Sequence, residues 1–96
     1  MNIVILNNIV NDTSSNSEGE KLFNVLESSI KQNQEVVLNI GPEEALSSSF
    51  LNSSIGRILE LYGLDKFKSL FKFKGSLNQF ERLSKYIKHY SEAHIS

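Results

Sequence analysis

The chain has 96 residues, of which 40% are hydrophobic and 22% are charged, a composition typical of one globular domain rather than of a disordered segment. It contains no cysteine, which excludes disulfides, thiolate metal sites and cysteine nucleophiles and favours a reducing compartment, so we expect a cytoplasmic protein. Its beginning, MNIVILNNIV, has no cationic start and too short an apolar run for a signal peptide or a membrane span, so we expect no membrane association.

The formal net charge of −1 hides an uneven distribution. Residues 1–65 carry three basic and nine acidic side chains, whereas residues 66–96 carry seven basic and two acidic side chains. This asymmetry predicts either a charged partner or a self-complementary surface, and the second possibility predicts a weak homodimer.

A strand and a helix are predicted first. Residues 2–6, NIVIL, are apolar and β-branched, which predicts a strand buried on both faces. After the polar stretch NDTSSNS, Ser17 and Glu20 have the spacing of a capping box and predict the start of a helix that ends near Gln32. The apolar positions of this helix are Leu22, Phe23, Leu26 and Ile30.

A second strand and a second helix follow. Residues 35–40, EVVLNI, predict a buried strand that Gly41 and Pro42 close, and the loop GPEEAL comes after it. From about Ser48 a helix is predicted, with Gly63 as its stop. Its apolar stripe consists of Leu51, Ile55, Ile58, Leu59 and Tyr62.

The third strand is predicted over residues 66–74, KFKSLFKFK, where apolar and basic residues alternate towards the end. Successive side chains of a strand point to opposite faces, so the phenylalanines are expected in the core and the lysines, Lys66, Lys68, Lys72 and Lys74, on the exposed face of an edge strand, where they oppose aggregation. The residues expected to share the inner face are Phe67, Ser69, Phe71 and Phe73.

The last helix is predicted from Ser76, with Gln79 at the capping-box position. Its apolar positions are Phe80, Leu83, Ile87 and Tyr90. The resulting βαβαβα order predicts a small α/β fold, a single domain over residues 1–96, with a mostly parallel sheet and helices on both sides of it.

The serine tract Ser47, Ser48 and Ser49, directly before an apolar helical run, is the strongest functional lead in the sequence. In the structural interpretation, one of these serines is the N-cap of the second helix and stabilises it by about 1 kcal/mol. In the functional interpretation, a serine hydroxyl at the carboxyl end of a parallel strand and at a helix N-terminus is a favourable place for a phosphate group. The two interpretations are compatible.

Three stretches of the chain resemble the STAS-like domains of unknown function, a bacterial family related to the STAS domains of anti-sigma factor antagonists and sulfate transporters. SNSEGEKLF is similar to their S-x-x-x-G-x-x-L first helix, VVLNI to a V-x-L-D-F strand, and SSSFLN to an S-S-S-F-L-N helix start. The likeness covers nearly the whole chain, and it implies a STAS-like fold.

The resemblance also implies a site. Antagonist STAS domains carry, in a D-S-S-G helix start, a serine that a partner kinase phosphorylates, and Ser48 falls at that position. The chain has Ser47 in place of the acidic residue, Phe50 in place of the glycine, and Asn39 in place of the aspartate that ends the strand. The resemblance thus implies a phosphorylation site at Ser48 and, as partner, a histidine-kinase-like ATPase or another signalling protein.

Patterns of catalytic residues are missing from the sequence. There is no H-E-x-x-H, no glycine-rich phosphate loop and no nucleophile elbow, and the carboxylates show no acid–base pairing. His89 and His94 are five residues apart, which does not place them on one helix face as metal ligands. We therefore expect no enzyme activity, no catalytic residue, no metal site and no cofactor.

We expect a small regulatory module of the STAS-like type that binds a protein partner through the loop and helix start at residues 47–54. Asn52 is expected to bond to the preceding loop or to contact the partner, and Gly56 to let its helix approach the sheet closely. The predicted partner-binding residues are Ser47, Ser48, Ser49, Phe50, Leu51 and Asn52.

Two alternative functions stay open. One is a nucleic-acid-associated protein that uses the basic C-terminal third, although alternation along residues 66–74 separates the phenylalanines from the lysines and so disfavours it. The other is a mobile-element-encoded inhibitor of a host protein, which fits the size of the chain.

Overall fold

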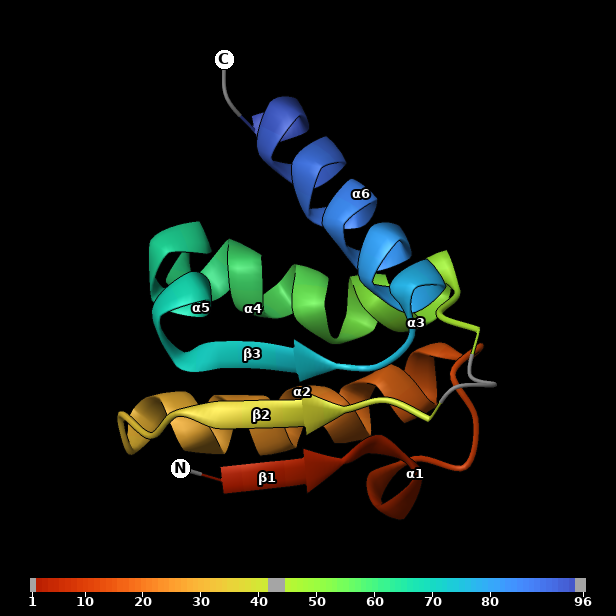
Figure 1. Cartoon of the computed structure of the whole chain (residues 1–96). Helices are drawn as coiled ribbons and strands as arrows, with labels where there is room; N and C mark the ends of the chain where they lie inside the picture. Colours follow the sequence, from red (N-terminus) through yellow and green to blue (C-terminus); the bar gives the residue numbers. More distant parts are fainter. Residues whose placement is uncertain (1, 42–44, 95–96) are drawn as a thin grey trace.

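Three short parallel strands form the sheet of the protein (Figure 1). In the computed structural model, which describes residues 2–41 and 45–94, they are β1 (Asn2–Ile5), β2 (Val36–Asn39) and β3 (Phe71–Lys74). The spatial order is β1-β2-β3, so each strand pairs with the next one along the chain. Both connections contain helices, as parallel pairing of neighbouring strands usually requires.

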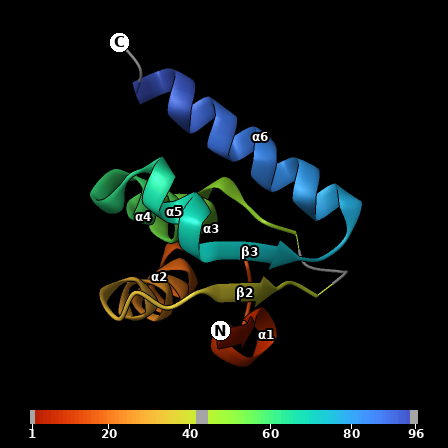
Figure 2. The same cartoon turned by 60° about the vertical axis from the view of Figure 1, so that its left-hand side comes forward.

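Six helices accompany the strands within the described residues. Figures 1 and 2 show α2 and α4 behind the sheet, whereas α6 leaves the end of β3 and extends away from the other helices. The expected small α/β fold with a parallel sheet and flanking helices is therefore confirmed. The helices are α1 (Leu6–Ile9), α2 (Asn16–Lys31), α3 (Ser48–Ser53), α4 (Ile55–Tyr62), α5 (Leu64–Leu70) and α6 (Leu77–His94).

The core lies between one face of the sheet and the helices. Alternate strand residues point to this face, where Val36, Leu38 and Phe71 are buried. Burial of such a side chain contributes about 1.5–3 kcal/mol, so this apolar face is what joins the sheet to the helices. The stripe predicted for α2 is confirmed, because none of its members is more than 5% exposed: Leu22, Phe23, Leu26 and Ile30.

The opposite face of the sheet is exposed, which corrects two expectations. The first strand is not buried on both faces: it ends at Ile5, and the side chains of Ile3 and Ile5 are 70% and 46% exposed. Leu6 instead begins α1 and is fully buried. The expectation of helices on both sides of the sheet is wrong, because the described helices pack on the face that carries Val36. A run of β-branched residues predicts a strand, but it does not show whether a second layer of helices covers it.

The third strand is shorter than the alternating pattern predicts. Residues 64–70 form α5, and only Phe71–Lys74 are extended. Phe67 is buried within α5, and its ring centroid lies 5.1 Å from that of Phe71, because Phe71 is the C-cap of α5 and residues four apart are neighbours on a helical turn. Ser69, expected on the inner face, is exposed. Within β3 itself the alternation is confirmed, with the phenylalanines towards the core and the lysines exposed.

The boundaries of the first two predicted helices differ from expectation. Ser15, not Ser17, is the N-cap of α2. The single helix predicted from Ser48 is divided at Ser54 into α3 and α4. Gly63 ends α4 as predicted, and its φ of 87° lies in the region that favours glycine.

The last helix, α6, begins with the predicted capping box. The amide of Ser76 donates to Oε1 of Gln79 at 2.9 Å, and the amide of Gln79 donates to Oγ of Ser76 at 3.3 Å. Leu83 is buried, but Phe80 is 58% exposed and does not belong to the core. The reason is that α6 extends away from the rest of the domain, so a narrower stripe of its apolar residues is in contact than their helical spacing predicts. Residues 42–44, predicted in a loop, lie outside the described residues.

Candidate functional site

The serine tract begins α3, and its first serine is structural. Oγ of Ser47 accepts a hydrogen bond from the amide of Phe50 at 3.1 Å, so Ser47 is the N-cap that the sequence predicts. The amide of Ser47 donates to the backbone oxygen of Thr13 at 3.1 Å. This second bond ties the start of α3 to the loop that precedes α2.

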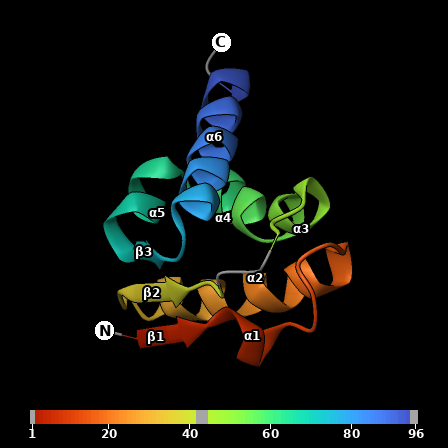
Figure 3. The ribbon, with the colours of Figure 1, turned by 45° about the vertical axis from the view of Figure 1, so that its right-hand side comes forward.

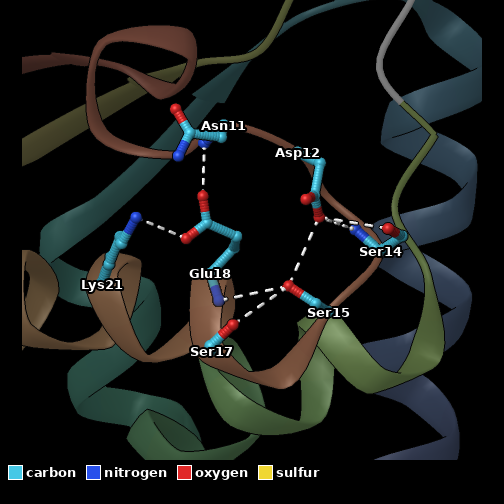
Figure 4. Close-up of polar contacts among 7 residues, drawn as sticks. All are labelled: Asn11, Asp12, Ser14, Ser15, Ser17, Glu18 and Lys21. Carbon is cyan, nitrogen blue, oxygen red and sulfur yellow. Dashed lines mark hydrogen bonds and ion pairs between the residues drawn. The ribbon is translucent and has the colours of Figure 1, made fainter.

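The loop before α2 is itself held by two carboxylates, of which Asp12 is the first (Figure 4). Oδ1 of Asp12 accepts hydrogen bonds from the amide of Ser14 at 3.0 Å and from the hydroxyl groups of Ser14 and Ser15 at 3.1 and 3.4 Å. These bonds, led by that of the Ser14 amide, lower the pKa of Asp12 below its ordinary value.

The second carboxylate, Glu18, lies on the first turn of α2. It accepts a hydrogen bond from the amide of Asn11 at 2.6 Å and forms an ion pair with Lys21 at 2.6 Å (Figure 4). The contact with Lys21, and then the Asn11 amide, lowers the pKa of Glu18. Thr13 lies between these two anchors, and its hydroxyl donates to the backbone oxygen of Ala45. The loop before α2 therefore fixes the position of the serine tract.

Ser48 and Ser49 are exposed on the first turn of α3. The hydroxyl oxygen of Ser48 accepts a hydrogen bond from Nη2 of Arg82 at 3.1 Å. The same guanidinium donates from Nε to the backbone oxygen of Leu46 at 3.1 Å, which fixes its orientation. The guanidinium therefore places one N–H donor, on Nη2, at the Ser48 hydroxyl, while its Nε is bound to the Leu46 backbone oxygen.

Phe50 and Leu51 belong to the core and not to the surface. They are 1% and 0% exposed, which corrects the expectation that a partner docks on them. α2 and α3 approach so closely here that a Cβ added at Gly19 would collide with Oγ of Ser53 and the backbone oxygen of Phe50. A partner at this segment therefore reaches the serines and Asn52, while Phe50 and Leu51 hold α3 in place.

Asn52 is exposed, and it bonds to α6 instead of the preceding loop. Its Oδ1 accepts a hydrogen bond from the hydroxyl of Tyr86 at 2.6 Å. Arg82 and Tyr86 are four residues apart on α6, as Ser48 and Asn52 are on α3, so each pair shares one helix face. We call these two contacts, Arg82–Ser48 and Tyr86–Asn52, the α3–α6 bridge. In Figure 3 α6 rises in front of α4, and α3 lies to the right of its first turns.

Gly56 lies at the same crossing. A Cβ added there would come within 3.0 Å of the Tyr86 hydroxyl, closer than real Cβ atoms approach another atom. Gly56 therefore lets α6 approach α4, whereas the sequence suggested a close approach to the sheet. Burial raises the pKa of Tyr86, so its hydroxyl remains a hydrogen-bond donor at neutral pH.

Sequence reasoning finds the serines but misses Arg82 and Tyr86. Each of the two residues lies 34 positions from its partner in the bridge. The shared four-residue spacing is the only signal in the sequence, and that spacing occurs many times in any helix. The bridge is thus a property of the tertiary structure.

The described part of the chain offers few other sites. It contains no group of three or more His, Cys, Asp or Glu side chains that could hold a metal ion, and none of its helices is long and apolar enough to cross a membrane. A hollow of about 310 Å³ lies at the carboxyl ends of β2 and β3, with Phe73, Gln79 and Phe80 in its lining and no charged residue. The α3–α6 bridge is therefore the best candidate for a functional site.

These features define a small α/β domain in which a capped, serine-bearing helix start follows a parallel strand. A family model described as a STAS-like domain of unknown function matches residues 18–79, which is more than half of the chain. The chain belongs to this family. A search of curated proteins and a search of solved structures found no match. The matched region ends before Arg82 and Tyr86, so the α3–α6 bridge joins a helix inside it to residues outside it.

Proposed function

We propose that the protein is a small regulatory module that binds a protein partner at the α3–α6 bridge, and that phosphorylation of Ser48 controls this binding. One observation carries the proposal: the hydroxyl of Ser48 is exposed and lies 3.1 Å from Nη2 of Arg82. The likeness of the helix start to that of anti-sigma factor antagonists supports the same position.

Arg82 makes Ser48 suitable for control by a phosphate group. Phosphorylation adds about −1.5 to −2 charges and three acceptor oxygens, and a guanidinium binds such a group through paired N–H donors. α3 has only six residues, so we assign the stabilisation to Arg82 and not to the helix dipole expected from the sequence. Phosphorylation would tighten the bridge and change the surface that a partner meets.

The exposed part of this surface is polar. It consists of Ser48, Ser49 and Asn52 together with the polar ends of Arg82 and Tyr86. A small polar surface suits a transient contact of the kind common in signalling. The proposed partner is a histidine-kinase-like ATPase or another signalling protein in the bacterial cytoplasm. The ATPase would transfer the γ-phosphoryl group of ATP to the Ser48 oxygen, with ADP as the leaving group and the hydroxyl proton passing to a base of the ATPase.

The test compares Ser48→Glu and Ser48→Ala with Ser28→Glu, which adds the same charge to an exposed serine of α2. Proteins that bind the wild-type chain are recovered from the cells that express it, and the affinity of each variant for them is measured. We expect Ser48→Glu to weaken binding by about tenfold or more, with Ser48→Ala and Ser28→Glu close to wild type and all thermal midpoints unchanged.

Mass spectrometry of the protein from its own cells provides a second readout, the phosphate on Ser48. The proposal fails if Ser48 carries no phosphate under any growth condition while Ser48→Glu binds like wild type. It also fails if affinity merely follows the thermal midpoint across the variants, since Ser48 would then act only through stability.

A further inference from the structure

The exposed face of the sheet has a defined pattern of side chains. The strand register places Ile3, Val37 and Lys72 in one row across the sheet, and Ile5, Asn39 and Lys74 in the next row on the same face. The two isoleucines are 70% and 46% exposed, Val37 is half-buried, and both lysines are exposed. The face therefore carries an apolar strip along β1 and β2 and a basic strip along β3. We call it the open face.

A bare face is unusual for a sheet of this type. All-parallel sheets occur almost only where both faces are covered, because strands joined by helical crossovers are normally packed on both sides. In residues 2–41 and 45–94 no helix passes in front of the strands in Figure 1: α2 and α4 lie behind them, and α6 rises from the end of β3 past its edge. Two exposed isoleucines therefore lie on a face that a second layer normally covers, and this face is accessible to another molecule.

The charges of the open face indicate the chemistry of the missing cover. Neither Lys72 nor Lys74 forms an ion pair with the described residues. The paired strand positions of this face hold no carboxylate, and Glu35 precedes β2 by one residue, outside the paired positions. A molecule with acidic groups beside β3 and apolar groups over β1 and β2 would complement both strips.

The size of the open face indicates the shape of the cover. Three strands of four residues give a surface of about 14 by 13 Å, or roughly 190 Å². A stable interface between two proteins needs about 800 Å² on each side, so any molecule that binds this face alone forms a weak, transient complex. One α-helix is about 10 Å wide and covers 13 Å of its length with roughly nine residues, which fits the open face.

We infer that the open face is a docking site for an amphipathic, acidic helix of a partner protein. Apolar residues of that helix pack on Ile3, Ile5 and Val37, and acidic residues along one flank pair with Lys72 and Lys74. The site is independent of the α3–α6 bridge, since it lies on the other side of the sheet from the helices that form the bridge.

The probe for this site is a synthetic helical peptide of about 15 residues, near the length at which isolated helices become stable. It carries leucines along one face and glutamates along one flank, and a matched peptide carries lysines in place of the glutamates. Titration is followed by the NMR signals of the isoleucine methyl groups. We expect the acidic peptide to shift the signals of Ile3 and Ile5 and not that of Ile58, which is fully buried in the core.

Variants of the protein test the contributions of the apolar strip and the basic strip to peptide binding one at a time. We expect Ile3→Glu to weaken binding of the acidic peptide by about tenfold or more, whereas Leu61→Glu, at a comparably exposed apolar residue of α4, leaves it unchanged. The double variant Lys72→Glu/Lys74→Glu should reverse the preference, so that the lysine peptide binds more tightly than the acidic one. Both lysines are exposed, so we expect this double variant to retain the fold. It therefore tests the docking site even if Ile3→Glu fails to fold.

Several results would overturn the inference. One is equal affinity of the acidic and lysine peptides for the wild-type chain. Another is a set of shifted signals that lies outside the open face. A third is no binding of the acidic peptide below millimolar concentration. A wild-type chain that sediments as a dimer and becomes a monomer on Ile3→Glu would show that a second copy occupies the face instead.

Discussion

Gly56 lies where α6 crosses α4, and its replacement by alanine provides a sharp test of that crossing. The added Cβ would collide with the hydroxyl of Tyr86, and the backbone oxygen of Leu51 is 3.3 Å away. Overpacking of this kind costs about 1–3 kcal/mol, while alanine gains about 1 kcal/mol in helix propensity over glycine. We expect Gly56→Ala to lower the free energy of unfolding by about 0–2 kcal/mol as the sum of these effects.

Removal of the Tyr86 hydroxyl should relieve the collision. Tyr86→Phe alone loses the hydrogen bond to Asn52 and costs about 0.5–1.5 kcal/mol. In the double variant the nearest ring atom, Cζ, lies 3.6 Å from the new Cβ, an ordinary van der Waals distance. The double variant should therefore be more stable than the sum of the single changes by about 1–3 kcal/mol.

The assay is urea unfolding of the wild type, both single variants and the double variant. Tyr62→Phe is the matched control, because the Tyr62 hydroxyl donates to Glu27 at 3.0 Å and takes no part in the crossing. Its combination with Gly56→Ala should be additive. If Gly56→Ala and Tyr86→Phe were also additive within about 0.5 kcal/mol, α6 would not cross α4 as described, and the α3–α6 bridge would lose its support.

Three further predictions concern caps, acid and backbone conformation. Ser47→Ala should lower the free energy of unfolding by about 1 kcal/mol in urea, because Ser47 caps α3, and Ser49→Ala should change it much less; equal effects would contradict the cap assignment. The folded state lowers the pKa values of Asp12 and Glu18, so their ionised carboxylates stabilise the folded protein. This contribution to the free energy of unfolding is complete above the ordinary pKa values of 3.8 and 4.5, and it is lost as the pH falls through the folded-state pKa values. The thermal midpoint of Glu18→Gln should therefore fall less on acidification than that of wild type, and parallel curves would exclude this role. Gly63→Ala should lower the thermal midpoint because φ at Gly63 is 87°, and an unchanged midpoint would show that the turn adapts.

Helical periodicity predicted the part of the fold that local sequence determines. The stripe of α2 from Leu22 to Ile30 is buried as expected, since a helix of this length has enough turns to define one face. Residues 66–74 show the limit of the method. Phe67 and Phe71 are four apart, a spacing that suits both a helix and one face of a strand, so the pattern alone could not place the boundary between α5 and β3.

The candidate site was predictable only in part. The cap at Ser47 follows from local chemistry, and local sequence contains that information. The burial of Phe50 and the hydrogen bonds of Arg82 depend on how α2, α3 and α6 pack together, and no pattern within one element specifies that packing. The open face was missed for a related reason: Ile3 and Ile5 have the composition of buried residues, and only the absence of a covering layer exposes them.

The strand pairing has a consequence for how the chain folds. Each pair in the sheet joins residues 34 or 35 positions apart, as Asn2 with Val36 and Val36 with Phe71. No hairpin is available as a local starting point, so the sheet closes only after long loops have formed, and refolding should be slower than that of a helical bundle of equal length. During synthesis β2 lacks its second neighbour until Lys74 has left the ribosome, and the edge of β2 is open to other chains for that interval.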